Sequence, residues 1–230
     1  KNITFTLKPT LSNYLKVQDV MILQILENVE HDRPVYFAVT VAPSNRLGLE
    51  QYLEMQGLVY QITNELGDSP ASPRINFEKM NFNIMQSNNN SKIITAKDYE
   101  QYMANSENNG VYRYTNLDNP NVYFPHHIVR LAGNYRSGFL QLAIEKLEEN
   151  QEIARDITQS NYLDSANKID RNNEIIVEIL DQMDKYLPST TIPIDIPINI
   201  QIASFYAMAD NKERASEILD PIAKNPNLNF

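Results

Sequence analysis

The sequence predicts an α+β fold: a small parallel α/β unit followed by α-helical hairpins. Two observations carry this prediction. Helix-like and strand-like segments alternate along the first part, as a helix at 17–29, a strand at 35–40, a helix at 46–56 and a strand at 58–62. Such alternation is typical of parallel strands joined by crossover helices. Beyond Pro125 the apolar residues have helical spacing, and no stretch alternates as a strand would.

The run at 35–40 is the expected centre of the α/β unit. It is apolar, β-branched and aromatic, with Pro34 before it and a turn-rich stretch at 42–45 after it. These features are typical of a short buried strand, and proline is tolerated where a strand begins. We therefore expect Phe37 or Val39 to face a buried core.

Other segments are expected to flank this strand. Ile3, Phe5 and Leu7 alternate with polar residues, which predicts a further strand at 3–7. A short helix is expected at 76–85, and Thr95 has the position of a helix cap with an acidic residue three positions later. The remaining stretches between 67 and 124 are rich in turn residues and are expected to be loops.

The part after Pro125 is expected to form helices joined by short connections. The predicted helices are 127–150, a more polar segment at 152–170, 172–186, 198–209 and 212–224, with a proline-stiffened connector at 189–197. We accordingly expect two domains, a small α/β unit with a loop-rich extension at 1–124 and a helical region at 125–230.

The last two predicted helices resemble a tetratricopeptide repeat, a helical hairpin of about 34 residues. The resemblance is carried by Ile202, Ala203, Tyr206, Ala215, Leu219, Ile222 and Pro226. Leu142 and Ala143 with residues 175–188 resemble an earlier, stretched copy. Because so few repeats cannot bury their own apolar faces, we expect them to lean on the α/β part.

Composition excludes several classes of function. Twenty basic and 29 acidic residues give a net charge of −9, which argues against nucleic acid as a partner. The chain has no cysteine, so disulfides and thiolate metal sites are excluded. No apolar run reaches the length of a membrane span. The chain opens without an initiator methionine, and we expect it to be part of a longer protein.

Ser44, Asn45 and Arg46 are the one candidate ligand site. They lie between a predicted parallel strand and a predicted helix, where α/β sheets bind ligands and helix N-termini attract anions. The alternative is that Ser44 or Asn45 simply caps the helix, and this is the simpler interpretation. No catalytic residue, metal site or cofactor is expected. The adjacent His126 and His127 point in different directions on a helix, and the acidic residues of 145–184 are expected to be solvated.

Several motifs together resemble the soluble tails of a family of bacterial multi-pass membrane proteins whose N-terminal half is similar to protein O-mannosyltransferases. The motifs are Arg33-Pro34-Val35-Tyr36-Phe37-Ala38, Leu47-Gly48-Leu49-Glu50-Gln51-Tyr52-Leu53, Gly57-Leu58-Val59-Tyr60, Asn119-Pro120-Asn121-Val122-Tyr123 and Asn134-Tyr135-Arg136. The resemblance covers most of residues 17–145 and, more loosely, 172–226.

The resemblance implies a non-catalytic domain on the extracytoplasmic (periplasmic) face of the inner membrane, tethered by N-terminal spans outside this sequence. Its role would be structural or acceptor recognition for a parent glycosyltransferase. Its partners would be the rest of the parent protein and a protein or glycan acceptor. The alternatives are a free-standing tetratricopeptide-type scaffold that binds a protein or peptide, and a hydrolase or sugar-binding protein that uses the loop at 41–48.

Overall fold

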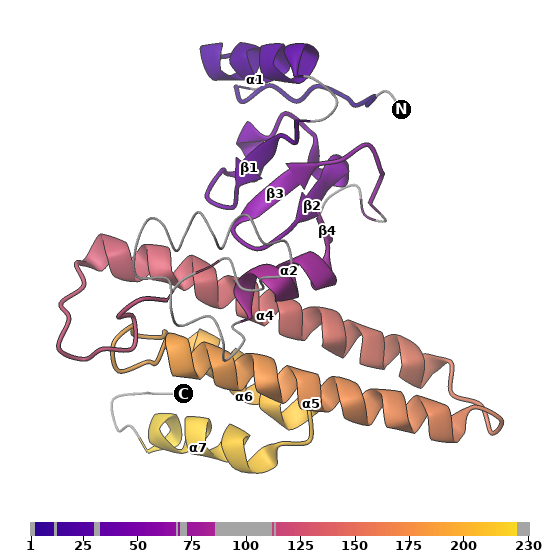
Figure 1. Ribbon diagram of the computed structural model, residues 1–230, viewed down its shortest axis with the longest axis vertical. Helices are drawn as coiled ribbons and strands as arrows, with labels where there is room; N and C mark the ends of the chain where they lie inside the picture. Colours follow the sequence, from indigo (N-terminus) through magenta and orange to yellow (C-terminus); the bar gives the residue numbers. More distant parts are fainter. Residues whose placement is uncertain are drawn as a thin grey trace, which may run out of the picture. The chain divides into compact units, whose positions relative to one another are not determined.

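The computed structural model describes residues 3–11, 13–29, 33–67, 69, 73–85, 112 and 114–224. The chain divides into two compact units, residues 1–80 and 81–230. The first contains a mixed sheet with short helices, and the second contains paired helices (Figure 1). The α+β class predicted from the sequence is therefore confirmed. The predicted domain limits of 1–124 and 125–230 stay a prediction, and the predicted helix start at Thr95 lies outside the described residues.

A four-stranded sheet forms the centre of the N-terminal unit, in the spatial order β1-β3-β2-β4. Its strands are β1 (Tyr36–Ala38), β2 (Leu53–Met55), β3 (Val59–Ile62) and β4 (Arg74–Ile75). Helix α1 (Val17–Asn28) precedes the sheet in the sequence, and α2 (Phe77–Ile84) follows it and contains the boundary between the two units. The helices predicted at 17–29 and 76–85 and the strands predicted within 35–40 and 58–62 are thus confirmed.

The predicted parallel arrangement of the sheet is wrong for its main strands. Strand β3 pairs antiparallel with both β1 and β2, and only β2 and β4 are parallel. Three residues connect Met55 to Val59, with Gly57 at a left-handed φ of 115°. A connection of this length forms a hairpin, whereas parallel strands need a crossover of about a dozen residues.

The helix predicted at 46–56 is also wrong. Two 3₁₀ turns, η1 (Pro43–Asn45) and η2 (Glu50–Tyr52), and strand β2 occupy this region instead. Leu47 and Gly48 have φ of 59° and 87°, and two successive left-handed residues cannot continue a right-handed helix. At Gly48 a Cβ would lie 2.6 Å from the carbonyl oxygen of Thr6, so only glycine fits without displacing the chain.

The segment predicted as a strand at 3–7 crosses this turn as an extended chain without strand pairing, which corrects that prediction. The Tyr52 hydroxyl donates to the Thr4 carbonyl at 2.7 Å, and the Lys8 amide donates to the Leu47 carbonyl at 2.9 Å. The alternation of its apolar residues nevertheless places one face of the segment against the core. Ile3 and Phe5 are partly buried against a core that contains Phe37, Leu49, Tyr52 and Leu53.

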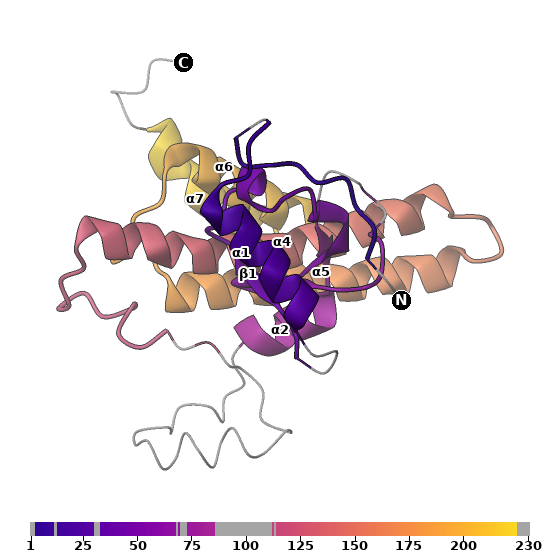
Figure 2. The same cartoon turned by 90° about the horizontal axis from the view of Figure 1, so that it is seen from above.

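Four long helices form the described part of the second unit after Pro125: α4 (His126–Arg155), α5 (Tyr162–Tyr186), α6 (Ile196–Met208) and α7 (Lys212–Ala223). In both views α4 and α5 run antiparallel, side by side (Figures 1 and 2). The predicted separate helix at 152–170 is wrong, because α4 extends to Arg155 and α5 already begins at Tyr162. Between them Asn161 closes the loop, accepting from the Thr158 amide at 2.6 Å and donating to the Asp156 carbonyl at 3.0 Å.

An apolar seam holds the helices together. Its fully buried side chains are Phe139, Leu142 and Ala143 on α4 and Ile176, Ile179 and Leu180 on α5. In the second hairpin Ala203 and Ala215 are buried, and α6 packs against α7. Small buried residues at both positions agree with the close helix approach that the sequence predicted. In the parts of the chain that the structure describes, the helices lack the combination of length and hydropathy that a transmembrane segment requires.

A buried arginine fixes the connector between α5 and α6. The Nη2 of Arg136 donates to the carbonyl of Leu187 at 2.9 Å and to that of Ile192 at 2.8 Å. Leu187 is the C-terminal cap of α5, where helix carbonyls lack partners within the helix. Burial lowers the pKa of Arg136, although the charge of Asp184 opposes this shift. The guanidinium remains ionised and replaces the missing backbone donors.

Candidate functional site

Ser44, Asn45 and Arg46 lie at a 3₁₀ turn rather than before an α-helix. Ser44 is exposed, Asn45 is half-buried and Arg46 is buried. The Arg46 guanidinium donates from Nε and Nη2 to the carbonyl of Val41, at 3.0 and 2.8 Å, and stacks on the ring of Tyr60 at 4.4 Å. The structure therefore engages Arg46 in holding the loop, and the helix N-terminus on which an anion site was predicted is absent. Ligand binding by these residues stays a prediction.

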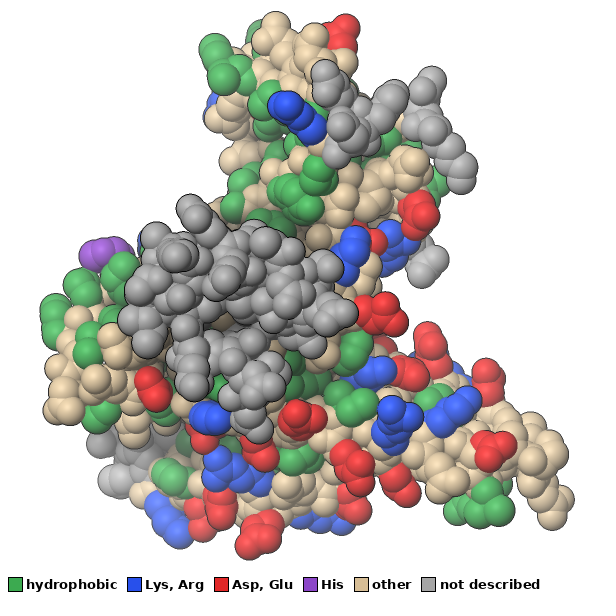
Figure 3. All heavy atoms as spheres, viewed as in Figure 1, with side chains coloured by type: hydrophobic (Ala, Val, Ile, Leu, Met, Phe, Trp, Pro, Cys, Tyr) green, Lys and Arg blue, Asp and Glu red, His purple; other side chains and the backbone are tan. Residues whose placement is uncertain are grey.

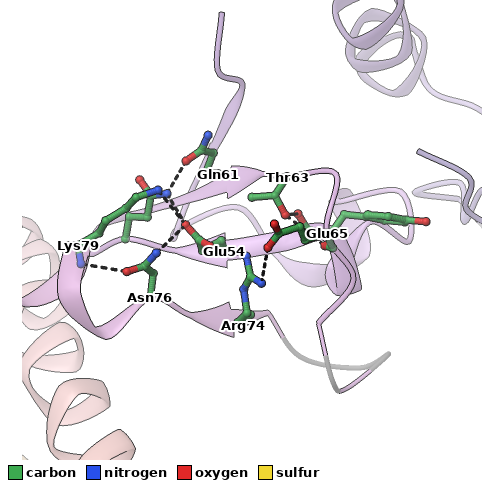
Figure 4. A network of polar contacts seen from close by, with 9 residues as sticks. Glu54, Gln61, Thr63, Glu65, Arg74, Asn76 and Lys79 are labelled. Atoms are coloured by element: carbon green, nitrogen blue, oxygen red, sulfur yellow. Dashed lines mark hydrogen bonds and ion pairs between the residues drawn. The ribbon is translucent and has the colours of Figure 1, made fainter. Parts of the chain in front are cut away.

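Glu54 organises a polar network on the sheet that sequence reasoning missed (Figure 4). Its carboxylate, 5% exposed, accepts from Gln56 at 2.8 Å, Arg74 at 2.5 Å, and Asn76 and Lys79 at 3.1 Å each. Arg74 also bridges to Glu65 at 2.9 Å. Gln56 directly follows β2, Arg74 lies on β4, Asn76 precedes α2 and Lys79 lies in its first turn, so the network joins β2 to β4 and to the start of α2.

The network keeps Glu54 ionised. Burial by itself would raise the pKa of Glu54, but the hydrogen bonds from Gln56, Lys79, Arg74 and Asn76 outweigh it and hold the pKa below its usual value. Because Gln56, Arg74, Asn76 and Lys79 all donate to the carboxylate, we interpret this group as a structural anchor.

Helix α1 presents an exposed apolar face. Val17, Met21 and Ile25 are four residues apart, hence on one side of the helix, and their exposed fractions are 77%, 57% and 51%. The same part of the chain exposes Leu11, Tyr14, Leu15 and Val20. Green side chains reach the surface around this helix in Figure 3.

The acidic residue near the start of α1 leaves this face uncharged. Asp19 is buried and accepts from the Thr10 amide, the Thr10 hydroxyl and the Lys16 amide at 3.1, 2.5 and 2.9 Å. Although burial would raise the pKa of Asp19, these hydrogen bonds lower it. Of the residues of α1, only Glu27 presents an exposed charge. A charge-free apolar face of this kind is typical of a surface covered by a partner.

The helical unit contains an elongated groove between α5 and α7, which we call the α5–α7 groove. One end is a cavity of about 330 Å³ lined by Leu187, Ile194, Ile202 and Ile218, among others. The groove continues past Asp181 and Arg214 and ends near Glu174 and Asp210. Its sections share lining residues: Asp184, Arg214 and Glu217 line both the cavity and the middle section, and Asp181, Asn211 and Glu213 line both the middle section and the far end.

Charged side chains along the α5–α7 groove are mostly acidic. Seven carboxylates and three basic groups line it, an excess of four negative charges. The carboxylates are those of Glu174, Glu178, Asp181, Asp184, Asp210, Glu213 and Glu217, and the bases are Lys185, Lys212 and Arg214. Figure 3 shows charged side chains of both signs over α5 and α7.

Several of these carboxylates bind side chains of the same unit. Arg214 bonds to Asp184 and Glu217, each at 2.7 Å, and the Tyr206 hydroxyl donates to Asp181 at 2.7 Å. Among the described residues, no basic side chain lies within ion-pairing distance of Glu178 or Glu213. The sequence predicted solvated acids on α5, but it could not show that those of α7 face them across a groove.

His126 and His127 are the first two residues of α4. In the described part of the chain, no group of three or more histidine, aspartate or glutamate side chains is arranged to hold a metal ion.

Comparison with known proteins links the N-terminal unit to a membrane-protein family. Residues 1–70 match the family model described as TMEM260-associated domain 2. TMEM260 is a family of multi-pass membrane proteins that are similar to O-mannosyltransferases. No curated protein and no solved structure matches the chain. The first 70 residues are thus similar to a domain that is associated with the TMEM260 family.

Proposed function

We propose that this chain is a non-catalytic, extracytoplasmic domain of a membrane glycosyltransferase of the O-mannosyltransferase-like type, with a structural or acceptor-recognition role. The observation that carries the proposal is the match of residues 1–70 to the TMEM260-associated domain. In this proposal the domain is tethered on the periplasmic face of the inner membrane by spans of the parent protein, and catalysis belongs to the membrane part.

The residues of the segment 1–70 that the structure engages in packing support a non-catalytic role. Leu47, Leu49 and Leu53 are fully or almost fully buried, and Tyr52 holds the N-terminal segment through its hydroxyl. Arg46 is occupied by a carbonyl and an aromatic ring. Residues of this segment that carry polar groups therefore serve the packing of the unit, which suits a domain that positions other parts of a protein.

The exposed face of α1 supports attachment to the rest of the parent protein. Val17, Met21 and Ile25 expose apolar area without competing charge. Burying such area stabilises association by roughly 25 cal/mol per Å². A basic amphipathic helix would favour the lipid surface instead, but α1 contains no lysine or arginine. We therefore assign this face to a protein surface of the parent.

Deletion tests the proposal in the full-length parent protein. Glycan transfer from membranes is measured with and without residues 1–230, and expression is followed by immunoblot. We expect transfer to fall. Loss with normal expression would indicate acceptor recognition, and loss of the protein itself would indicate a structural role. Full transfer by a well-expressed truncated protein would refute the proposal, as would transfer or hydrolysis by the isolated domain.

A point substitution separates attachment from general damage to the domain. Met21→Glu in the full-length protein places a charge on the apolar face, whereas Gln24→Glu adds the same charge at an exposed polar position of the same helix. We expect only Met21→Glu to reduce transfer or stability of the parent protein. Equal behaviour of the two variants would show that the face has no partner.

A further inference from the structure

We infer that the α5–α7 groove binds an extended cationic protein segment that carries one apolar side chain. The groove lies within residues 173–222, outside the segment that matches a known family, so the inference does not rest on the proposed membrane function. It concerns a binding surface of the helical unit alone.

The apolar end of the groove suits a side chain. Its lining includes the buried side chains of Leu180 and Met183 on α5 and of Leu187 at the cap of α5, together with Ile194 and Ile218. Its volume of about 330 Å³ lies at the lower end of the roughly 300–1,000 Å³ typical of ligand pockets. An apolar side chain that enters would replace water over this lining, which is favourable.

The rest of the groove selects the charge of the ligand. Glu178 of α5 and Glu213 of α7 lie across the acidic section, and their carboxylates have no ion-pair partner among the described residues. Lysine or arginine side chains would complement them, whereas an acidic segment or a nucleic acid would be repelled. A metal ion would need ligands gathered at one point, and the described residues offer no such group.

Arg214 lies between the apolar cavity and the acidic section of the groove, and so fixes their order along it. Its ion pairs with Asp184 and Glu217 lie where the acidic section meets the apolar cavity. A ligand that occupies both sections therefore has its basic residues on one side of the apolar residue, separated by the length of this junction. The groove thus favours a segment of defined pattern over any basic peptide.

Binding can be measured with the complete chain and a peptide array. The peptides carry a single Leu, Ile, Met or Phe with Lys and Arg residues at varied spacing. Matched peptides replace the basic residues by Glu or the apolar residue by Ser. Hits are then measured by fluorescence anisotropy. We expect binding only to peptides with both features, and weaker binding when salt is raised from about 0.1 M to about 1 M, which shortens the screening length from about 10 to about 3 Å.

Variants of exposed residues locate the site. The double variant Glu178→Lys with Glu213→Lys should weaken binding by about tenfold or more, because attraction becomes repulsion. The double variant Glu148→Lys with Glu152→Lys changes the net charge equally on exposed positions of α4 and should leave affinity within about twofold, since distant exposed charges are screened. Ser189→Trp, at the exposed rim of the cavity, should abolish the preference for the apolar residue.

The inference is overturned by several results. One is that no peptide of the array binds the folded chain. Another is that acidic peptides bind equally well, or that the two double variants behave alike. Circular dichroism and thermal unfolding of each variant show that the chain remains folded, so that a loss of binding reports on the groove.

Discussion

Both units of this protein bury charged side chains, and Glu54 and Arg136 are stabilised in different ways. Glu54 in the N-terminal unit is 5% exposed and Arg136 in the helical unit is 4% exposed. Glu54 meets two opposite charges and two amides. Arg136 meets the carbonyl groups of a connector. A sheet brings side chains of different strands together, whereas a helix end leaves carbonyls that need donors.

This difference predicts that substitution of Arg136 lowers the stability of the chain more than substitution of Glu54. The carboxylate of Glu54 has several donors, and Arg74 retains Glu65 if Glu54 is lost. The carbonyls of Leu187 and Ile192 share one guanidinium. Substitution of the arginine therefore leaves buried backbone groups without the donor that satisfies them, which is costly.

The largest effect is expected for Arg136→Ala. Two buried carbonyls lose a charged donor and a cavity remains, so the free energy of unfolding should fall by about 3–5 kcal/mol. Urea unfolding followed by circular dichroism measures this change. Arg136→Lys keeps the charge but cannot donate in the same fork geometry, and it should restore part of the stability. Equal stability of Arg136→Ala and the parent chain would show that the carbonyls of Leu187 and Ile192 do not depend on this guanidinium.

A smaller effect is expected for Glu54→Gln. The size of the side chain is retained, but Arg74 and Lys79 lose their shared counter-charge, at a cost of about 1–3 kcal/mol. The matched control is Glu65→Gln, because Glu65 binds the same arginine from an exposed position and should change stability by less than about 1 kcal/mol. If both variants lost the same stability in urea unfolding, burial would not be the deciding factor.

The pH dependence of stability should follow from the same carboxylate. The folded-state pKa of Glu54 lies below the ordinary value of 4.5, so its contribution is present above that pH and is lost as the pH falls through the folded-state pKa. We expect the unfolding free energy of the parent chain to decline from about pH 4.5 downward, and Glu54→Gln to decline less. Parallel pH profiles of the two chains, measured by urea unfolding, would contradict this assignment.

The smallest effect is expected for Arg214→Gln. Arg214 pairs with Asp184 and Glu217, but its side chain is 37% exposed, and both partners are more exposed still. Exposed ion pairs contribute about 0–1 kcal/mol, so the midpoint of thermal unfolding should hardly move. A loss as large as that for Arg136→Ala would show that exposure does not separate these two arginines.

Much of the helical part could be predicted because its signal is local. Apolar residues spaced three and four apart along 127–150 and 172–186 indicated two helices, and α4 and α5 contain these segments. The polar stretch at 152–170 was predicted as a separate helix, but its first residues continue α4 and residues from Tyr162 onward already belong to α5. Ala203 and Ala215 were expected at a close helix contact, and both are buried.

The α/β part was harder because its order depends on distant residues. The apolar spacing around Leu47 and Leu53 fitted a helix, yet the chain turns at Leu47 and Gly48 to admit the segment around Thr6. The candidate site at 44–46 was derived from that helix. Its arginine binds Val41 and Tyr60 in the structure.

The class of the fold, most helix positions and two of the strands could be predicted from the sequence, because they follow from periodicity within one segment. The antiparallel sheet, the network around Glu54 and the groove between α5 and α7 became visible in the folded chain alone. Each joins residues far apart in the chain, such as Glu54 with Lys79, or Glu178 with Glu213. Which distant segments meet depends on the packing of the whole unit, and no local pattern encodes it.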